Sequence, residues 1–145
     1  MKKINNRLQF YKFQLKKHVF SAEFSEAKNL IFGEAATIES KRKGLQMLLL
    51  WEARRGQETP LGVFCTITLL KPRMIDLEGT IKDEEILSIL YGSAMTKFVN
   101  FASSFTQYRG SLYKIAKILG IQSYIIDYRH LFSHGKQMPS LRVFQ

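Results

Sequence analysis

The sequence predicts an all-α fold of about five or six helices. Apolar residues recur at helical spacing through most of the chain, and several of these stretches begin at a capping residue and end at a glycine. Only three prolines occur among the 145 residues. A chain of this length can bury one core but is short for two ordinary domains, so we expect a single helical domain.

The first two predicted helices follow a basic N-terminal stretch. Ser21 followed by Glu23 indicates a helix start, with acids near the positive end of the helix dipole, and Gly33 ends this helix. From Glu34 to about Arg55, the apolar spacing predicts the longest helix. Because Trp51 lies in this apolar helix, we expect it in the core rather than as a platform for stacking nucleobases.

Two central helices are predicted from their first residues. Thr59 before Pro60 is typical of an N-cap followed by proline in the first helical position, and Pro72 ends the stretch. The β-branched residues between them leave a strand as the alternative. Thr80, followed three residues later by an acid, is a capping-box-like start to a core helix that extends through Phe101.

Two short helices complete the predicted bundle. The first runs from Ser111 to Leu119 and is closed by Gly120. The second runs from Ser123 to His134 and is closed by Gly135. The turns between the predicted helices are short, which favours a compact helical bundle.

Positive charge is concentrated at the two ends of the chain. Residues 1–20 carry six Lys or Arg and no acid, and residues 86–145 carry seven with Asp127 as the single acid. The net charge of +10 predicts an acidic partner, either nucleic acid or an anionic membrane surface. We expect residues 1–18 to be a basic arm and residues 19–145 to be the folded domain. The alternative is that the basic residues only form a soluble surface and an unstructured arm.

The single cysteine and the lack of long apolar stretches limit the cellular setting. Cys65 lies in an apolar run, so we expect a buried thiol, no intramolecular disulfide and a reducing compartment. The N-terminus lacks the apolar core of a secretory signal, although its acid-free start leaves an organelle transit peptide as an alternative. No stretch has the apolar length that would span a bilayer.

The helix predicted over residues 123–134 concentrates the side chains best suited to chemistry: Asp127, Arg129, His130 and His134. On an ideal helix the two histidines are about 40° apart, whereas Arg129 and His134 are about 140° apart and about 7.5 Å apart along the axis. Arg129 could wrap round the helix, the last turn could fray, or a second copy of the helix could complete the site across a two-fold axis. We favour the second copy, because an isologous dimer brings the same patch of both subunits together.

Two other interpretations of this cluster remain. Arg129 could pair with Asp127 or another acid while the histidines cap the C-terminus of the helix. His130 and His134 also have the i, i+4 spacing of zinc ligands, but no recognisable motif supplies a third ligand. The spacing Arg-x-x-x-x-His is therefore a weak signal by itself.

RNA is a substrate for which one arginine and two histidines suffice. Its 2′-hydroxyl attacks the adjacent phosphate once a base removes the proton and a cation stabilises the developing charge. Histidine titrates near neutral pH, and the arginine fork matches phosphate oxygens. These residues therefore predict metal-independent cleavage that leaves a 2′,3′-cyclic phosphate and a 5′-hydroxyl.

Several blocks of sequence occur in a fixed order along the chain. They are Trp51-Glu52-Ala53-Arg54 with Pro60 and Thr66, Leu90-Tyr91-Gly92 with Ala94, Phe98-Val99-Asn100, Ile125 to His130 with Ser133 and His134, and Met138 to Leu141. Together they resemble the Las1-like family of HEPN endoribonucleases over most of residues 19–143. Lys97, Leu131 and Ser133 depart from the arginine, glutamate and threonine that are common in this family.

The resemblance implies an HEPN-type bundle and an endoribonuclease that cuts the second internal transcribed spacer of pre-ribosomal RNA in the nucleus and nucleolus. It implies a homodimer bound to a polynucleotide kinase that phosphorylates the new 5′-hydroxyl, with no cofactor and no membrane partner. By position, Arg129, His130 and His134 are its active-site residues. The family continues past the position of Gln145, so we expect this bundle to lack the final helix, as a short isoform, a paralogue or a fragment would.

Two functions of another class remain as alternatives. A non-catalytic RNA- or protein-binding module would keep the helices and the basic ends without turnover, and salt-dependent RNA binding without strand scission would identify it. A scaffold subunit would only hold and stabilise the kinase, which a pull-down with an active-site mutant would separate from catalysis.

Overall fold

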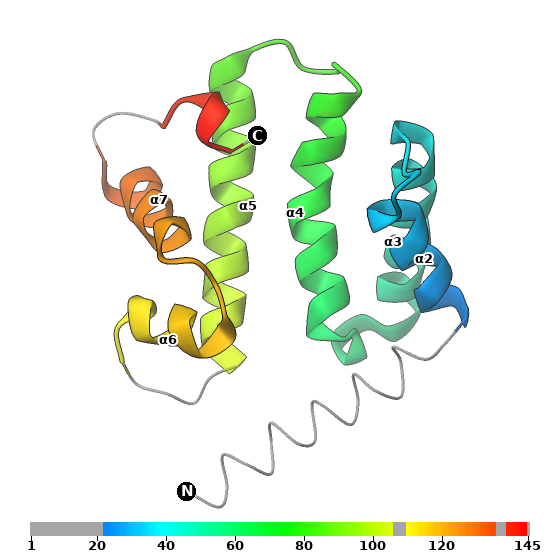
Figure 1. The fold of residues 1–145 in the computed structure, drawn as a ribbon, viewed down its shortest axis with the longest axis horizontal. Coiled ribbons are helices and arrows are strands. Elements are labelled where there is room, and N and C mark those ends of the chain that lie inside the picture. The colour runs from blue at the N-terminus through cyan, green and yellow to red at the C-terminus, as the bar shows by residue number, and fades with distance from the viewer. Residues whose placement is uncertain (1–21, 106–109, 136–138, 145) are drawn as a thin grey trace, which may run out of the picture. The chain divides into compact units, whose positions relative to one another are not determined.

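The computed structural model describes residues 22–105, 110–135 and 139–144, and over these ranges the chain forms helices and no β-strand (Figure 1). The α-helices are α2 (Ala22–Phe32), α3 (Ile38–Arg55), α4 (Leu61–Leu77), α5 (Glu84–Phe105), α6 (Leu112–Leu119) and α7 (Ser123–His134), with 3₁₀ turns η1 (Gly56–Glu58) and η2 (Leu141–Val143). The prediction of an all-α fold is confirmed. None of the described helices is long and apolar enough to cross a membrane.

The chain divides into two compact units, Met1–Ile67 and Thr68–Gln145, and the division falls within α4. The single folded domain expected over residues 19–145 stays a prediction. The basic arm predicted for residues 1–18 lies outside the described residues. The side chains predicted to carry chemistry all belong to the second unit.

In the first unit, α2 packs against α3 at a point where a glycine is required. An added Cβ at Gly44 would lie 2.6 Å from Ile31 Cγ1 and 3.2 Å from the carbonyl oxygen of Ala27. Ala27 and Ile31 are both buried on α2. The two helices therefore approach closely because position 44 carries no side chain.

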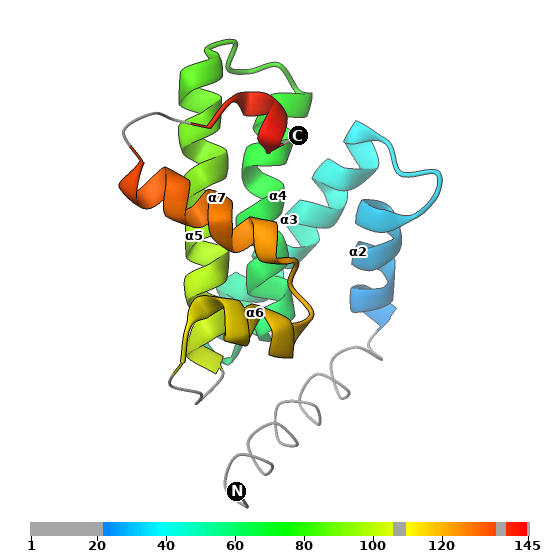
Figure 2. The same cartoon turned by 60° about the vertical axis from the view of Figure 1, so that its left-hand side comes forward.

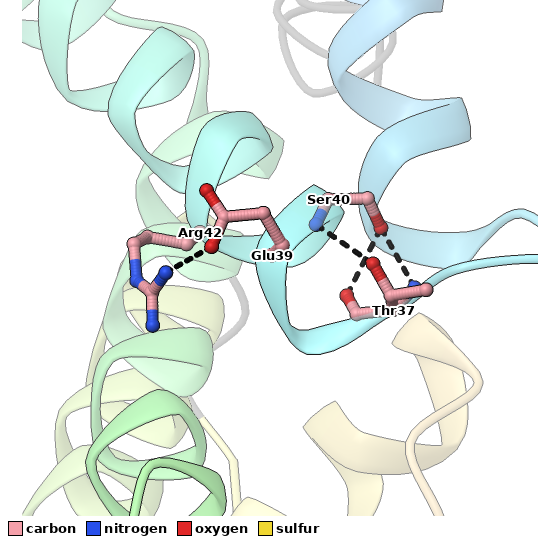
Figure 3. Close-up of polar contacts among 4 residues, drawn as sticks. All are labelled: Thr37, Glu39, Ser40 and Arg42. Carbon is pink, nitrogen blue, oxygen red and sulfur yellow. Dashed lines mark hydrogen bonds and ion pairs between the residues drawn. The ribbon is translucent and has the colours of Figure 1, made fainter.

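A capping box starts α3 four residues later than predicted (Figure 3). The Thr37 hydroxyl accepts the backbone N–H of Ser40 at 3.1 Å, and the Ser40 hydroxyl accepts the N–H of Thr37 at 2.8 Å. These bonds satisfy N–H groups that a helix start leaves without partners. The predicted start at Glu34 is wrong because this reciprocal cap, which apolar spacing does not show, sets the first turn. The prediction that this is the longest helix is also wrong, because α3 has 18 residues and α5 has 22.

Trp51 is a core residue of the first unit, as predicted. Its side chain is buried, and its indole Nε1–H donates to Glu23 Oε2 at 2.9 Å. The Phe24 ring stacks on it with ring centroids 5.9 Å apart. The carboxylate satisfies the polar atom of the indole, so the residue can be buried without an unpaired donor. The Cys65 thiol of the same unit is half-buried, and burial raises its pKa.

Helix α4 runs through Pro72, so the prediction that this proline ends the helix is wrong. A proline inside a helix removes one backbone hydrogen bond at a cost of about 3 kcal/mol. Leu70, Pro72 and Met74 are all buried, and their burial offsets that loss. The helix ends instead near Gly79, whose φ of 62° is in the left-handed region. The alternative prediction of a strand between Pro60 and Pro72 is wrong, because this segment is helical.

In the second unit, α6, α7 and η2 pack against α5. Helix α7 crosses the middle of α5, and α6 lies near its C-terminal end (Figures 1 and 2). Val99, Ala116 and Ile126, one from each helix, form the buried core of this arrangement. Gly92 of α5 lies against the Phe132 ring of α7, and an added Cβ there would overlap that ring. The position of α7 on α5 is fixed by these contacts.

The starts of α6 and α7 match the sequence prediction. The predicted start of the core helix at Thr80 is wrong, because α5 begins at Glu84 and Asp83 is its cap. Asp83 caps α5, where its carboxylate accepts the N–H groups of Glu85 at 2.9 Å and Ile86 at 3.1 Å. Ser111 caps α6, and Gly120 ends it with a φ of 70°. Helix α7 has the predicted bounds, Ser123–His134. Local capping chemistry therefore determines the start of α5 and both ends of α6, whereas no side-chain hydrogen bond caps the start of α7 at Gln122.

Candidate active site on α7

One face of α7 is anchored in the core, and this anchoring directs its polar residues outward. Ile126 is 1% exposed and packs with Val99 and Ala116. The helix continues to His134, and the N–H of Gly135 donates to the carbonyl of Leu131 at 2.8 Å. The last turn is therefore closed, which removes fraying as a way to bring Arg129 and His134 together.

The two histidines are neighbours on the surface of α7, as their spacing predicts. The ring centroids of His130 and His134 are 6.2 Å apart, with an angle of 27° between the ring planes. His130 is half-buried and His134 is exposed. Two imidazoles thus stand side by side, and both are at least partly open to a ligand.

Tyr113 of α6 extends this pair into a row of three rings, and sequence reasoning missed it. Its ring stacks on His130 with centroids 6.1 Å apart and planes inclined by 30°. Its hydroxyl donates to Asp127 Oδ1 at 2.5 Å, and this hydrogen bond is the main reason why the pKa of Tyr113 is raised. The hydroxyl therefore remains a donor throughout the neutral range. Sequence spacing could not predict this contact, because Tyr113 and its partners on α7 belong to different helices.

The Arg129 side chain reaches Asn100 of α5. Its Nη2 donates to Asn100 Oδ1 in a long hydrogen bond of 3.5 Å, and its Nε is buried without a hydrogen-bond partner among the described residues. Asp127 bonds to Tyr113, and no ion pair joins Arg129 to an acid within the described ranges. The guanidinium charge is therefore not compensated by the described part of this chain.

The structure thus brings His130 and His134 together but leaves Arg129 on another face of the same helix. Of the three ways to unite them, fraying is absent, and the guanidinium bonds to Asn100 instead of wrapping toward His134. Within residues 22–105, 110–135 and 139–144, no group of three His, Cys, Asp or Glu side chains is placed to hold a metal ion.

Residues 18–145 match the family model described as Las1-like. The chain belongs to the Las1-like family. It is 34% identical over 99 residues to the mouse (Mus musculus) protein named "Ribosomal biogenesis protein LAS1L". The aligned region covers 67% of this chain but only 12% of that relative. No solved structure matches the chain.

Three positions of this Las1-like chain depart from the pattern noted in the sequence. Leu131 is 43% exposed, and Ser133 is exposed on the same helix, so neither changes the buried face of α7. Lys97 is also exposed, and its ammonium lies 5.8 Å from the centre of the Phe101 ring. These substitutions alter the surface near the candidate site but not the packing that positions it.

Proposed function

We propose that this Las1-like chain is a metal-independent endoribonuclease domain that acts in ribosome biogenesis and cuts the second internal transcribed spacer of pre-ribosomal RNA. The observation that carries the proposal is the pair of accessible imidazoles 6.2 Å apart on the same short helix as an arginine without an acidic partner among the described residues. The name of the mouse relative supports the biological setting. The net charge of +10 favours a polyanionic substrate.

In the proposed reaction, one histidine removes the proton of the ribose 2′-hydroxyl. The 2′-oxygen attacks the adjacent phosphorus, and the bond from phosphorus to the 5′-oxygen breaks. The other histidine donates a proton to that leaving oxygen, so the products are a 2′,3′-cyclic phosphate and a 5′-hydroxyl. Arg129 stabilises the charge that develops on the phosphate oxygens. His130 and His134 fill the two proton-transfer roles in either order.

We propose that the complete site is composite and forms in a homodimer. Arg129 lies on a different face of α7 from His134, and the helix is closed at its last turn. A second α7 related by a two-fold axis would bring the arginine of one copy to the histidines of the other. A polynucleotide kinase partner and a nucleolar location belong to the same proposal, because the 5′-hydroxyl product is the substrate of such a kinase.

The test is cleavage of a spacer-derived RNA by the purified chain in the presence of EDTA. His134→Ala should lower the initial rate about 10²- to 10⁴-fold, because it removes one proton-transfer group. Ser133→Ala, an exposed neighbour outside the ring row, is the matched control and should cleave at the normal rate. If the chain cleaves no RNA, or if His134→Ala leaves cleavage unchanged, the proposal is wrong.

The composite site has a separate test in mixed dimers of two inactive variants. Coexpressed Arg129→Ala and His134→Ala subunits form heterodimers in which one of the two composite sites keeps both residues. The mixture should recover about a quarter of the wild-type rate, since half of the dimers are mixed and each has one intact site. A site contained in one subunit would give no recovery, which contradicts the composite arrangement.

A further inference from the structure

The open end of the row of rings on α6 and α7 is a place where a nucleobase can stack. Tyr113 is 45% exposed although one side of its ring faces His130. The row continues from His130 to His134, so the accessible tyrosine ring and the two imidazoles form one continuous surface. Exposed aromatic rings in such rows are what proteins use to bind the bases of single-stranded RNA.

The hydrogen bond between Tyr113 and Asp127 fixes the orientation of this ring. This hydrogen bond, 2.5 Å long, joins the first turn of α6 to α7, so the ring does not swing freely in solvent. A ring held in advance loses less conformational entropy when a base stacks on it. The rigid ring therefore has the properties of a prepared stacking platform.

Two lysines on the same helix as Tyr113 favour a polyanion, while the tyrosine hydroxyl itself contacts the Asp127 carboxylate. Lys114 and Lys117 are exposed on α6, which contains no acidic residue. Aromatic side chains beside lysines are the usual combination for single-stranded nucleic acid, because the ring stacks on the base while the ammonium groups attract the backbone. Tyr124 offers a contrast, since it is 51% exposed but lies edge-on to Tyr128 and not in the histidine row.

We propose that Tyr113 is a nucleobase-stacking subsite that holds single-stranded RNA next to His130 and His134. The inference rests on the proposed function, and it adds that the bases beside the cleaved bond are unpaired and bound by stacking. Stacking is tolerant of base identity, because every base has an aromatic face. The subsite therefore selects single-stranded over double-stranded RNA rather than one sequence.

The experiment measures binding of a fluorescein-labelled 12-mer of adenosines by anisotropy, with the full chain carrying His134→Ala to prevent cleavage. In this parent, Tyr113→Leu should weaken binding about 5- to 150-fold, the range expected for one lost base–aromatic stack. Tyr113→Phe keeps the ring and loses only the hydrogen bond to Asp127, so its affinity should stay within about threefold of the parent. Tyr124→Leu is the matched control and should bind like the parent.

A ribose-phosphate 12-mer without bases separates stacking from charge. Tyr113→Leu should bind this oligomer as well as the parent does, because there is no base to lose. The subsite is overturned if Tyr113→Leu binds the adenosine oligomer normally, if the loss is equal on the abasic oligomer, or if Tyr113→Phe is as weak as Tyr113→Leu. Failure of the parent itself to bind RNA would overturn the proposed function as well.

Discussion

Two tyrosine–aspartate pairs in the second unit show how one type of hydrogen bond serves different purposes in two environments. Tyr91 donates to Asp76 at 2.7 Å and is 7% exposed, with its ring stacked on Phe144. Tyr113 donates to Asp127 at 2.5 Å and is 45% exposed, with its ring on His130. The buried pair joins elements of the fold, whereas the exposed pair positions an aromatic surface beside ionisable groups.

The pKa values of the two phenols express the same contrast. Burial is the largest cause that raises the pKa of Tyr91 to about 12, whereas the hydrogen bond to Asp127 is the largest cause at Tyr113. The Arg73 Nη1 lies 3.3 Å from Oδ2 of the half-buried Asp76 and pairs with it, but no cation pairs with Asp127 among the described residues. We infer that the Tyr91 region contributes to stability and the Tyr113 region to function.

The largest expected difference between the two regions is in stability. Tyr91→Ala should lower the free energy of unfolding by about 3–5 kcal/mol, because it removes a buried aromatic ring from the core. Tyr113→Ala should lower it much less, because its ring is 45% exposed and lies outside the buried core. Urea unfolding followed by circular dichroism measures both changes. Equal losses in the two variants would contradict the division between a structural and a functional pair.

Arg129 on α7 and Arg73 at the Asp76 pair should differ in their effect on catalysis. Arg129→Ala should lower the rate of RNA cleavage about 10²- to 10³-fold, because it removes the charge that stabilises the transition state. Arg73→Ala, at the Asp76 pair, should leave the rate per folded molecule unchanged while it reduces stability slightly. The measurement is the initial cleavage rate at saturating RNA, corrected for the folded fraction. A similar loss of rate in both variants would remove the functional distinction.

The smallest expected effect is a loss of stability at high pH that comes from the buried pair. The pKa of Tyr91 is raised from its ordinary value of 10 to about 12, so the unfolded state releases the proton before the folded state does. Its contribution to stability is complete below pH 10 and is lost as the pH rises to about 12, by about 2–3 kcal/mol. In Tyr91→Phe this part of the pH dependence should disappear, as unfolding in urea between pH 9 and 12 would reveal. A pH dependence equal to that of the wild type would show that Tyr91 is not its source.

Most of the helices could be predicted because their ends depend on neighbouring residues. Ser111 and Gly120 at α6 follow from capping chemistry that is local in sequence. Helix α7 has the predicted bounds without a side-chain cap at Gln122. The helix through Pro72 could not be predicted, because burial of that segment depends on distant parts of the chain. The start of α3 was missed because Ser40 is an unusual partner for Thr37 in a capping box, where glutamate or glutamine is expected.

The candidate site was predictable only where it lies on one helix. His130 and His134 share a stripe because helix geometry requires it, and the ring distance agrees. The partners of Asp127 and Arg129 are Tyr113 on α6 and Asn100 on α5, and neither follows from spacing along α7. Contacts between helices depend on how the helices pack, and spacing along one helix does not show this.

The glycine at position 92 has a consequence for how this helix pair can vary. Because the Phe132 ring fills the place of a side chain on α5, even a methyl group at Gly92 would push α7 outward. His130 and His134 flank Phe132 on the same helix, so they would be displaced together with α7. The lack of a side chain at Gly92 therefore determines how closely α7 packs against α5, and with it the position of both imidazoles. A residue on α5, outside the candidate site, thus limits which substitutions the site tolerates.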